Sequence, residues 1–204
     1  MTAIFIVLRV PNYLGFTPEK SLSLLRDHSH YLLLSGHIVL GSVAFICCGL
    51  QLWPWLRQRH PKVHRVSGRI YVIVVIPGSV LAAVSSVLAF TPIPARVGNV
   101  LGSALWLLTT LIGFRMARNR RFVEHRRWMI RSFALCFSIV LSRVLGIFWL
   151  LGLLPFLDSH YGGNMDALVA DVATAGVWSS FMISILAAEW WFERKPKRRR
   201  APAG

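Results

Sequence analysis

Two histidines, His64 and His125, are the residues of this sequence best suited to bind a ligand. They lie in the segments HPKVHRVSGR and EHRRWMIRS. If the two side chains enter the membrane at matched depth on two helices, they could ligate a b-type haem from both sides. Arginines beside them could hold haem propionates or anionic lipid headgroups, because guanidinium groups bind carboxylate and phosphate well. These arginines are Arg65, Arg69, Arg126, Arg127 and Arg131.

A second polar group lies inside long apolar stretches and comprises His37, Gln51, Arg143 and Asp171. Ionisable residues are costly in a membrane and therefore mark candidate sites. His37, Arg143 and Asp171 are predicted at similar depth in the outer half. Gln51 follows His37 by about 14 residues and Arg143 follows His125 by about 18, so each pair shares one helix face. The sequence thus predicts two polar stripes, and either an Arg143–Asp171 ion pair between helices or a ligand site.

The elements that carry these residues are membrane-spanning helices. Of the 204 residues, 55% are hydrophobic and 15% charged, which is too few charges for a water-soluble domain of this size. The apolar stretches are continuous rather than alternating, so they predict helices and not strands, each long enough to cross about 30 Å of hydrocarbon. We predict an all-α multi-pass transmembrane helical bundle of about five spans. The predicted spans are 31–56, 70–90, 97–114, 128–154 and 167–192.

Both ends of the chain are predicted to lie outside the spans. Residues 1–30 are interpreted as an extracytoplasmic or interfacial segment, because Ala3–Val10 is too short to span and Pro11 follows it. The segment also lacks the basic start and cleavage site of a signal peptide. A further helix lost from this end is the alternative. Residues 194–204 are predicted to be a basic cytoplasmic tail.

The distribution of basic residues predicts the orientation. The net charge is +15, and eighteen of the 23 Lys and Arg fall in the loops after the first and third spans and in the tail. This is the positive-inside pattern, which places the N-terminus outside and the C-terminus in the cytoplasm. The same partition argues against a nucleic-acid partner, since no zinc-finger or RNA-recognition motif accompanies the charge. Anionic lipids at the cytoplasmic face are the expected partners.

Several chemical classes find no support in the sequence. Cys47, Cys48 and Cys136 lie within predicted spans and form no extracellular disulfide framework. There is no Walker-type loop, GxSxG turn or HExxH motif, so nucleotide-driven transport and zinc proteolysis are not indicated and no metal site is predicted. No nucleophile, base and orienting residue form a group, so hydrolytic or transferase activity is not favoured.

The segment GHIVLGSVAFICCGLQLWPWLRQRHPKVHRVSGRIYV, followed by EHRRWMIRSFAL, resembles the family of predicted membrane proteins called domain of unknown function 2306. The resemblance extends from about His30 to the fifth span. It implies a small helical bundle in a bacterial plasma membrane and implies no activity. Members of the family often have a complete helix before the first one matched here.

Three functions remain open from the sequence. The first is membrane electron transfer through a b-type haem held by the histidine pair. The second is a transporter or carrier with a site made by His37, Arg143 and Asp171, in which Pro77 and Gly78 could kink the second helix. The third is a scaffold or accessory subunit whose Arg-His surface holds anionic headgroups or a partner protein. The substrate, the protein partner and the oligomeric state are not predicted.

Overall fold

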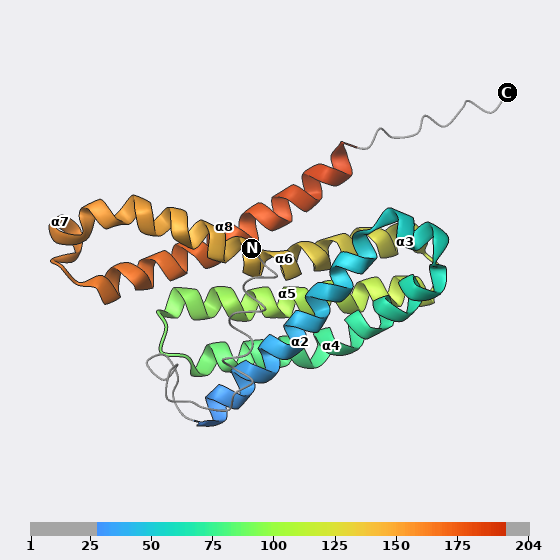
Figure 1. Ribbon diagram of the computed structural model, residues 1–204, viewed down its shortest axis with the longest axis horizontal. Coiled ribbons are helices and arrows are strands. Elements are labelled where there is room, and N and C mark those ends of the chain that lie inside the picture. Colours follow the sequence, from blue (N-terminus) through green and yellow to red (C-terminus); the bar gives the residue numbers. More distant parts are fainter. Residues whose placement is uncertain (1–27, 195–204) are drawn as a thin grey trace.

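Eight helical segments make up the part of the chain that the computed structural model describes, residues 28–194 (Figure 1). They are α2 (His28–Leu52), α3 (Pro54–Arg59), α4 (Pro61–Leu88), α5 (Ile93–Arg118), α6 (Phe122–Leu153), η3 (Leu154–Phe156), α7 (Leu157–Tyr161) and α8 (Met165–Glu193). No strand occurs in these residues. The segment 1–27 and most of the predicted tail, 195–204, fall outside the described residues.

Five of the helices are long and apolar enough to cross a membrane, which confirms the predicted fold class. Prolines define where several helices begin, because proline suits the first turn and lacks the N–H that a continuing helix needs. Pro54 starts α3, so the first helix ends at Leu52 rather than at residue 56. Pro61 starts α4, so this helix begins before the predicted span at residue 70 and includes His64.

The four helices α2, α4, α5 and α6 surround one core. Helix α4 packs between α2 and α5, and α5 packs between α4 and α6 (Figure 1). A smaller contact between α2 and α6 closes the ring. Helices α4 and α6 therefore lie across the core from each other and run in the same direction. Helix α8 packs mainly on α6 and less on α5.

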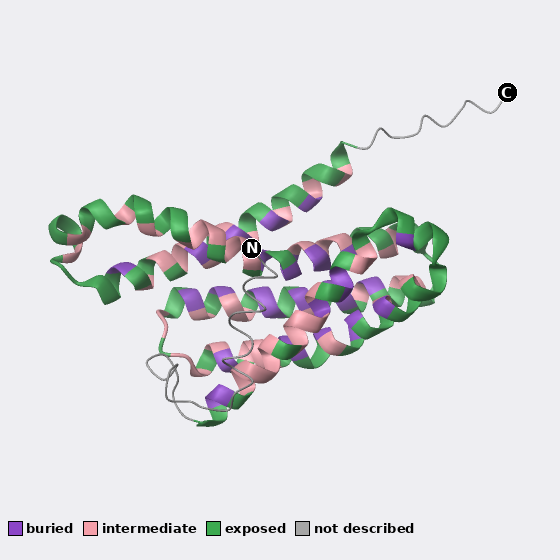
Figure 2. Cartoon of the chain, viewed as in Figure 1, coloured by how far each residue is buried: buried purple, intermediate pink, exposed green. Residues whose placement is uncertain are grey.

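The outer surface of the bundle is apolar, as expected for helices that face lipid. Large hydrophobic side chains are exposed along every long helix, and Ile73 on α4 and Leu186 on α8 are 66% and 60% exposed. The core instead contains many small polar residues, including Ser79, Ser138 and Ser180. Figure 2 shows this distribution, with buried residues on the inner faces and exposed ones outside. Small residues allow membrane helices to approach closely.

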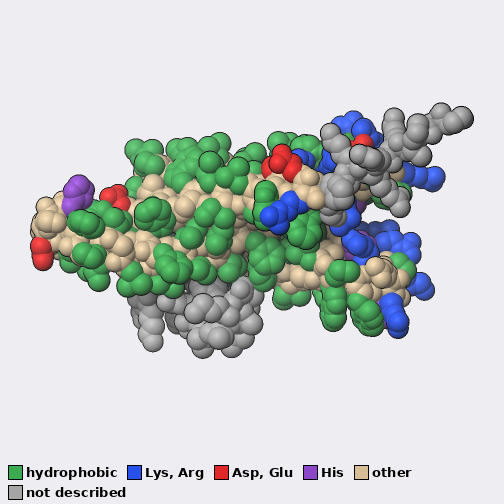
Figure 3. Space-filling model, turned by 90° about the horizontal axis from the view of Figure 1, so that it is seen from above, with side chains coloured by type: hydrophobic (Ala, Val, Ile, Leu, Met, Phe, Trp, Pro, Cys, Tyr) green, Lys and Arg blue, Asp and Glu red, His purple; other side chains and the backbone are tan. Residues whose placement is uncertain are grey.

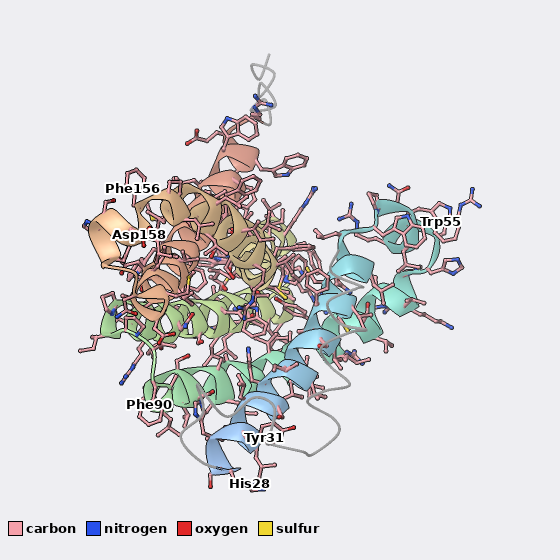
Figure 4. The ribbon with its side chains drawn as sticks, turned by 60° about the vertical axis from the view of Figure 1, so that its left-hand side comes forward. His28, Tyr31, Trp55, Phe90, Phe156 and Asp158 are labelled. Carbon is pink, nitrogen blue, oxygen red and sulfur yellow. The ribbon has the colours of Figure 1, made fainter. Side chains whose placement is uncertain are left out.

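Most of the Lys and Arg gather at one end of the molecule, which we call the basic end (Figure 3). It is the end at which α2 finishes, α4 and α6 begin and α5 finishes. Trp55 lies at this end (Figure 4). Phe90, after α4, and Asp158, in α7, lie at the opposite end, which we call the far end. Within the described residues, the basic end carries Arg57, Arg59, Lys62, Arg65, Arg69, Arg115, Arg118, Arg120, Arg121, Arg126 and Arg127.

Candidate functional site

Helices α2 and α4 are joined by polar contacts that recur at a seven-residue step. One step leads from His30 to His37 on α2, and from Ser85 to Gly78 on α4. Two further steps lead to Gln51 on α2 and to His64 on α4. The contacts are His30 Nε2 with Ser85 Oγ (3.0 Å), His37 Nδ1 to Gly78 O (2.9 Å), and Gln51 Nε2 to His64 O (2.6 Å) and to Ser67 Oγ (2.7 Å). Seven residues are about two helical turns, so a regular antiparallel pairing brings them into register. The predicted common face of His37 and Gln51 is confirmed, and it is the face that packs on α4.

The same step relates His64 and His125 across the core. Tyr71 on α4 and Ser132 on α6 form a hydrogen bond of 2.7 Å between their hydroxyl oxygens. His64 and His125 each lie seven residues before these partners, on helices that run in the same direction. The two histidines therefore occupy one level, about 10 Å closer to the basic end. His64 lies within electrostatic range of His125 and of Arg57.

The imidazole of His125 is held by the neighbouring helix. Its Nδ1 donates to the main-chain oxygen of Gly113 on α5, at 2.8 Å. Gly113 is buried where α5 meets α6, and Met129 covers the side on which a Cβ would project. A hydrogen bond from one ring nitrogen to a backbone carbonyl fixes the tautomer, and metal-bound histidines are commonly oriented this way. Nε2 is left as the nitrogen with a free lone pair.

His64 has a different environment. Its main-chain oxygen accepts the hydrogen bond from Gln51 already described, but its Nδ1 is buried and has no hydrogen-bond partner among the described residues. Buried side-chain nitrogens without partners are uncommon in folded proteins and call for an explanation, such as a ligand. Within residues 28–194, both histidines at this level thus have a ring nitrogen without a hydrogen-bond partner from the protein.

A closed hydrogen-bond network lies directly beneath the histidine level. Trp106 Nε1 donates to Tyr71 Oη (3.0 Å), and Thr110 Oγ1 donates to Trp106 O (2.7 Å) while lying 2.6 Å from Ser132 Oγ. The Thr110 hydroxyl already donates its hydrogen to the Trp106 carbonyl, so it can only accept from Ser132. The Ser132 hydroxyl therefore donates to Thr110 and accepts from Tyr71. Every hydroxyl donates once and all four side chains are buried. Satisfied networks of this kind rigidify a core. Hydropathy alone does not predict this network, although Tyr and Trp inside apolar spans signal buried polar groups that need partners.

The arginines predicted to contact propionates or headgroups divide into two groups. Four of them are exposed at the basic end: Arg65, Arg69, Arg126 and Arg127. Arg131 instead pairs with Glu189 on α8, through Nε at 2.6 Å and Nη2 at 3.1 Å. Its guanidinium also lies over the rings of Trp128 and Phe192. Arg131 therefore joins α6 to α8.

The predicted pair of Arg143 and Asp171 does not form. The ion pairs of the described residues are Arg121–Glu124 and Arg131–Glu189. The Arg131–Glu189 contact shows the register of the antiparallel helices α6 and α8, and in that register Arg143 is level with residue 177. Asp171 is thus about 9 Å further along α8. Asp171 instead accepts a hydrogen bond from Tyr161, at 3.1 Å.

Other candidate ligands and hollows lie away from the histidine pair. Cys47, Cys48 and Cys136 are free thiols in the core cluster. Within residues 28–194, no group of three His, Cys, Asp or Glu is arranged to hold a metal ion. One surface hollow lies between α4 and α5 and another along α6 and α8, and neither is lined by either histidine.

The family of predicted membrane proteins DUF2306 matches this chain over residues 34–190. The match includes all of α4, α5 and α6, most of α2 and both histidines of the pair. No curated protein and no solved structure matches the chain. The chain therefore belongs to the DUF2306 family of predicted membrane proteins.

Proposed function

We propose that this integral membrane protein carries electrons by means of one b-type haem, held between His64 and His125 at the basic end. The observation that carries the proposal is the common level of the two imidazoles on helices that face each other across the core. Ligands and cofactors in helical bundles are commonly held by side chains from facing helices. A haem with two histidine ligands exchanges one electron at a time.

The state of each imidazole supports ligation. The bond from His125 Nδ1 to Gly113 O orients the ring, and in the neutral imidazole Nε2 then carries the lone pair that can bind a metal. The buried Nδ1 of His64 lacks any protein partner among the described residues. A bound group beside the imidazole would supply the partner that this buried nitrogen lacks.

The surrounding charge suits a group with carboxylates. Arg65 and Arg126 directly follow the two histidines in the sequence and are exposed at the same end, and Arg69 is exposed one turn further along α4. Guanidinium groups near the headgroup region can pair with two propionates and remain hydrated. The same exposed arginines, together with Arg127, are proposed to contact anionic headgroups of the surrounding lipid.

Variants of single histidines test the assignment. The full chain is expressed with haem supplied, purified in detergent, and its haem content per chain is measured by absorbance. We expect about one haem per chain, and at least a tenfold loss in H64A and in H125A, because each removes one of the two histidines proposed to hold the haem. His60 at the basic end and His160 in α7 are both exposed, so H60A and H160A are matched controls that should keep the haem. Full occupancy in either H64A or H125A would contradict the proposed ligation.

The solute-carrier alternative requires a joint site of His37, Arg143 and Asp171. In the described residues each of them has a different environment: His37 binds Gly78, Asp171 binds Tyr161, and Arg143 is exposed. No observation joins them, so electron transfer is the function that the geometry supports best.

A further inference from the structure

An apolar hollow lies at the far end, between the last turn of α4 and the first turns of α5. It is lined by Val87, Ile93, Arg96, Val97, Val100 and Leu101. Its apolar side chains face outward, and Ile93 is 71% exposed. The one charged group of the lining is the guanidinium of Arg96. Figure 4 marks the neighbouring Phe90, in the link that joins the two helices beside the hollow.

Arg96 is held in place but is not neutralised. Its Nε donates to the main-chain oxygen of Thr91 at 2.7 Å, which orients the guanidinium at the start of α5. Neither ion pair of the described residues includes it. The four N–H groups on its terminal nitrogens form no hydrogen bond within the described residues. A guanidinium fixed by one bond presents the rest of its planar fork to an acceptor.

The position of Arg96 is unusual for this chain. Most of the described Lys and Arg lie at the basic end or within a few turns of it, whereas Arg96 and Arg143 lie toward the far end. Arg96 belongs to the first turn of α5, where the helix meets the headgroup region. Helix α5 runs from there toward the bilayer centre, so Val97, Val100 and Leu101 lie about 2 to 8 Å deeper. A cation at the headgroup level thus stands at the mouth of an apolar hollow that leads into the hydrocarbon.

We propose that this hollow binds one glycerophospholipid, with its phosphodiester on the Arg96 guanidinium and an acyl chain against Val97, Val100 and Leu101. Two phosphate oxygens could accept hydrogen bonds from the terminal N–H groups of Arg96, which have no acceptor among the described residues. The apolar lining distinguishes a lipid from a soluble phosphate, which would gain nothing from it. The site is independent of the histidine pair, since it lies at the opposite end of the bundle.

Site-resolved crosslinking tests the proposal, because the arginines of the basic end also attract anionic lipid. The full chain is reconstituted in vesicles that contain phosphatidylglycerol with a photoactivatable diazirine in one acyl chain. After illumination, labelling of the peptide spanning residues 93–101 is quantified against peptides from the basic end. R96Q should reduce labelling of this peptide by about tenfold, the usual effect of losing a charge-assisted contact of about 1.5 kcal/mol. R143Q removes the other far-end arginine and should leave the labelling unchanged.

Competition and a second variant complete the test. Dioleoyl phosphatidylglycerol should displace the probe, whereas dioleoylglycerol, which has no phosphate, and glycerol 3-phosphate, which has no acyl chain, should not. V100W fills the hollow while keeping Arg96, and it should also reduce labelling if R96Q proves unstable. The proposal is overturned if R96Q and V100W are labelled like the parent, if R143Q loses labelling equally, or if either partial ligand displaces the probe.

Discussion

At the scale of single residues, Tyr71 connects three helices of the core. Its hydroxyl accepts a hydrogen bond from Trp106 on α5 and donates one to Ser132 on α6, while its ring packs edge-on against Phe133. Because the side chain is fully buried, no water is at hand to replace a lost partner. The network fixes the distance across the core between α4 and α6, and so fixes the level at which His64 and His125 stand.

Replacing Tyr71 by Phe removes the hydroxyl and keeps the ring. We expect the free energy of unfolding to fall by about 1 kcal/mol, since interhelical hydrogen bonds in membrane proteins contribute about 0.6 to 1.7 kcal/mol. Thermal unfolding in detergent measures the loss. Y161F is the matched control, because the Tyr161 hydroxyl binds Asp171 at the exposed far end and should cost much less. Equal losses in the two variants would show that the core network adds nothing.

At the scale of helices, close approach depends on glycines where α5 meets α6 and α8. A Cβ on Gly102 would collide with the ring of Phe181 on α8. The ring would have to leave its place, and overpacking of this kind typically costs 1 to 3 kcal/mol, here taken as about 2 kcal/mol.

G102A should therefore lower the unfolding midpoint and loosen the contact between α5 and α8. Gly152 on α6 has no heavy atom within 4 Å of where a Cβ would lie. G152A is the control, and it should be neutral or slightly stabilising because alanine favours helix over glycine. Thermal unfolding of both variants side by side measures the difference. A G102A protein as stable as G152A would mean that Phe181 moves aside at no cost.

How far these features could be read from sequence depends on whether they are local. Continuous apolar stretches identify spans without any knowledge of neighbours, and Pro61 marks the start of the helix that carries His64. Partners across helices follow from register and packing, which hydropathy does not encode. The Arg131–Glu189 pair and the absence of an Arg143–Asp171 pair both follow from the alignment of α6 and α8. The Tyr71 network likewise needed the crossing of three helices to become visible.

At the scale of the whole molecule, the described part is a bundle with a charged end and an extended apolar hairpin. Helices α6 and α8, with η3 and α7 between them, extend past the far ends of α4 and α5 (Figure 1). The hairpin carries exposed aromatic residues, among them Phe148 at 66% and Phe156 at 54% exposure. The basic end is proposed to face the cytoplasm of a plasma membrane, with the C-terminus inside, because Lys and Arg are retained on that side during insertion.

Labelling of single cysteines tests this orientation. The three native cysteines are replaced by serine or alanine, and a new one is placed at either end, in R120C or D158C. We expect a membrane-impermeant maleimide to label D158C in intact cells and R120C only after the membrane is opened. Both positions are exposed, so accessibility in the protein does not differ between them. The reverse pattern of labelling would invert the proposed orientation.

The proposed haem site depends on features of every size: on two imidazoles, on the register of α4 and α6, and on a charged end that suits propionates. The absorption spectrum of the purified parent protein, expressed with haem supplied and recorded before and after reduction with dithionite, tests it most directly. A haem held by His64 and His125 should give a Soret band, with sharp visible bands in the reduced form that are typical of two histidine ligands. A folded protein with no Soret band would contradict haem binding at this pair.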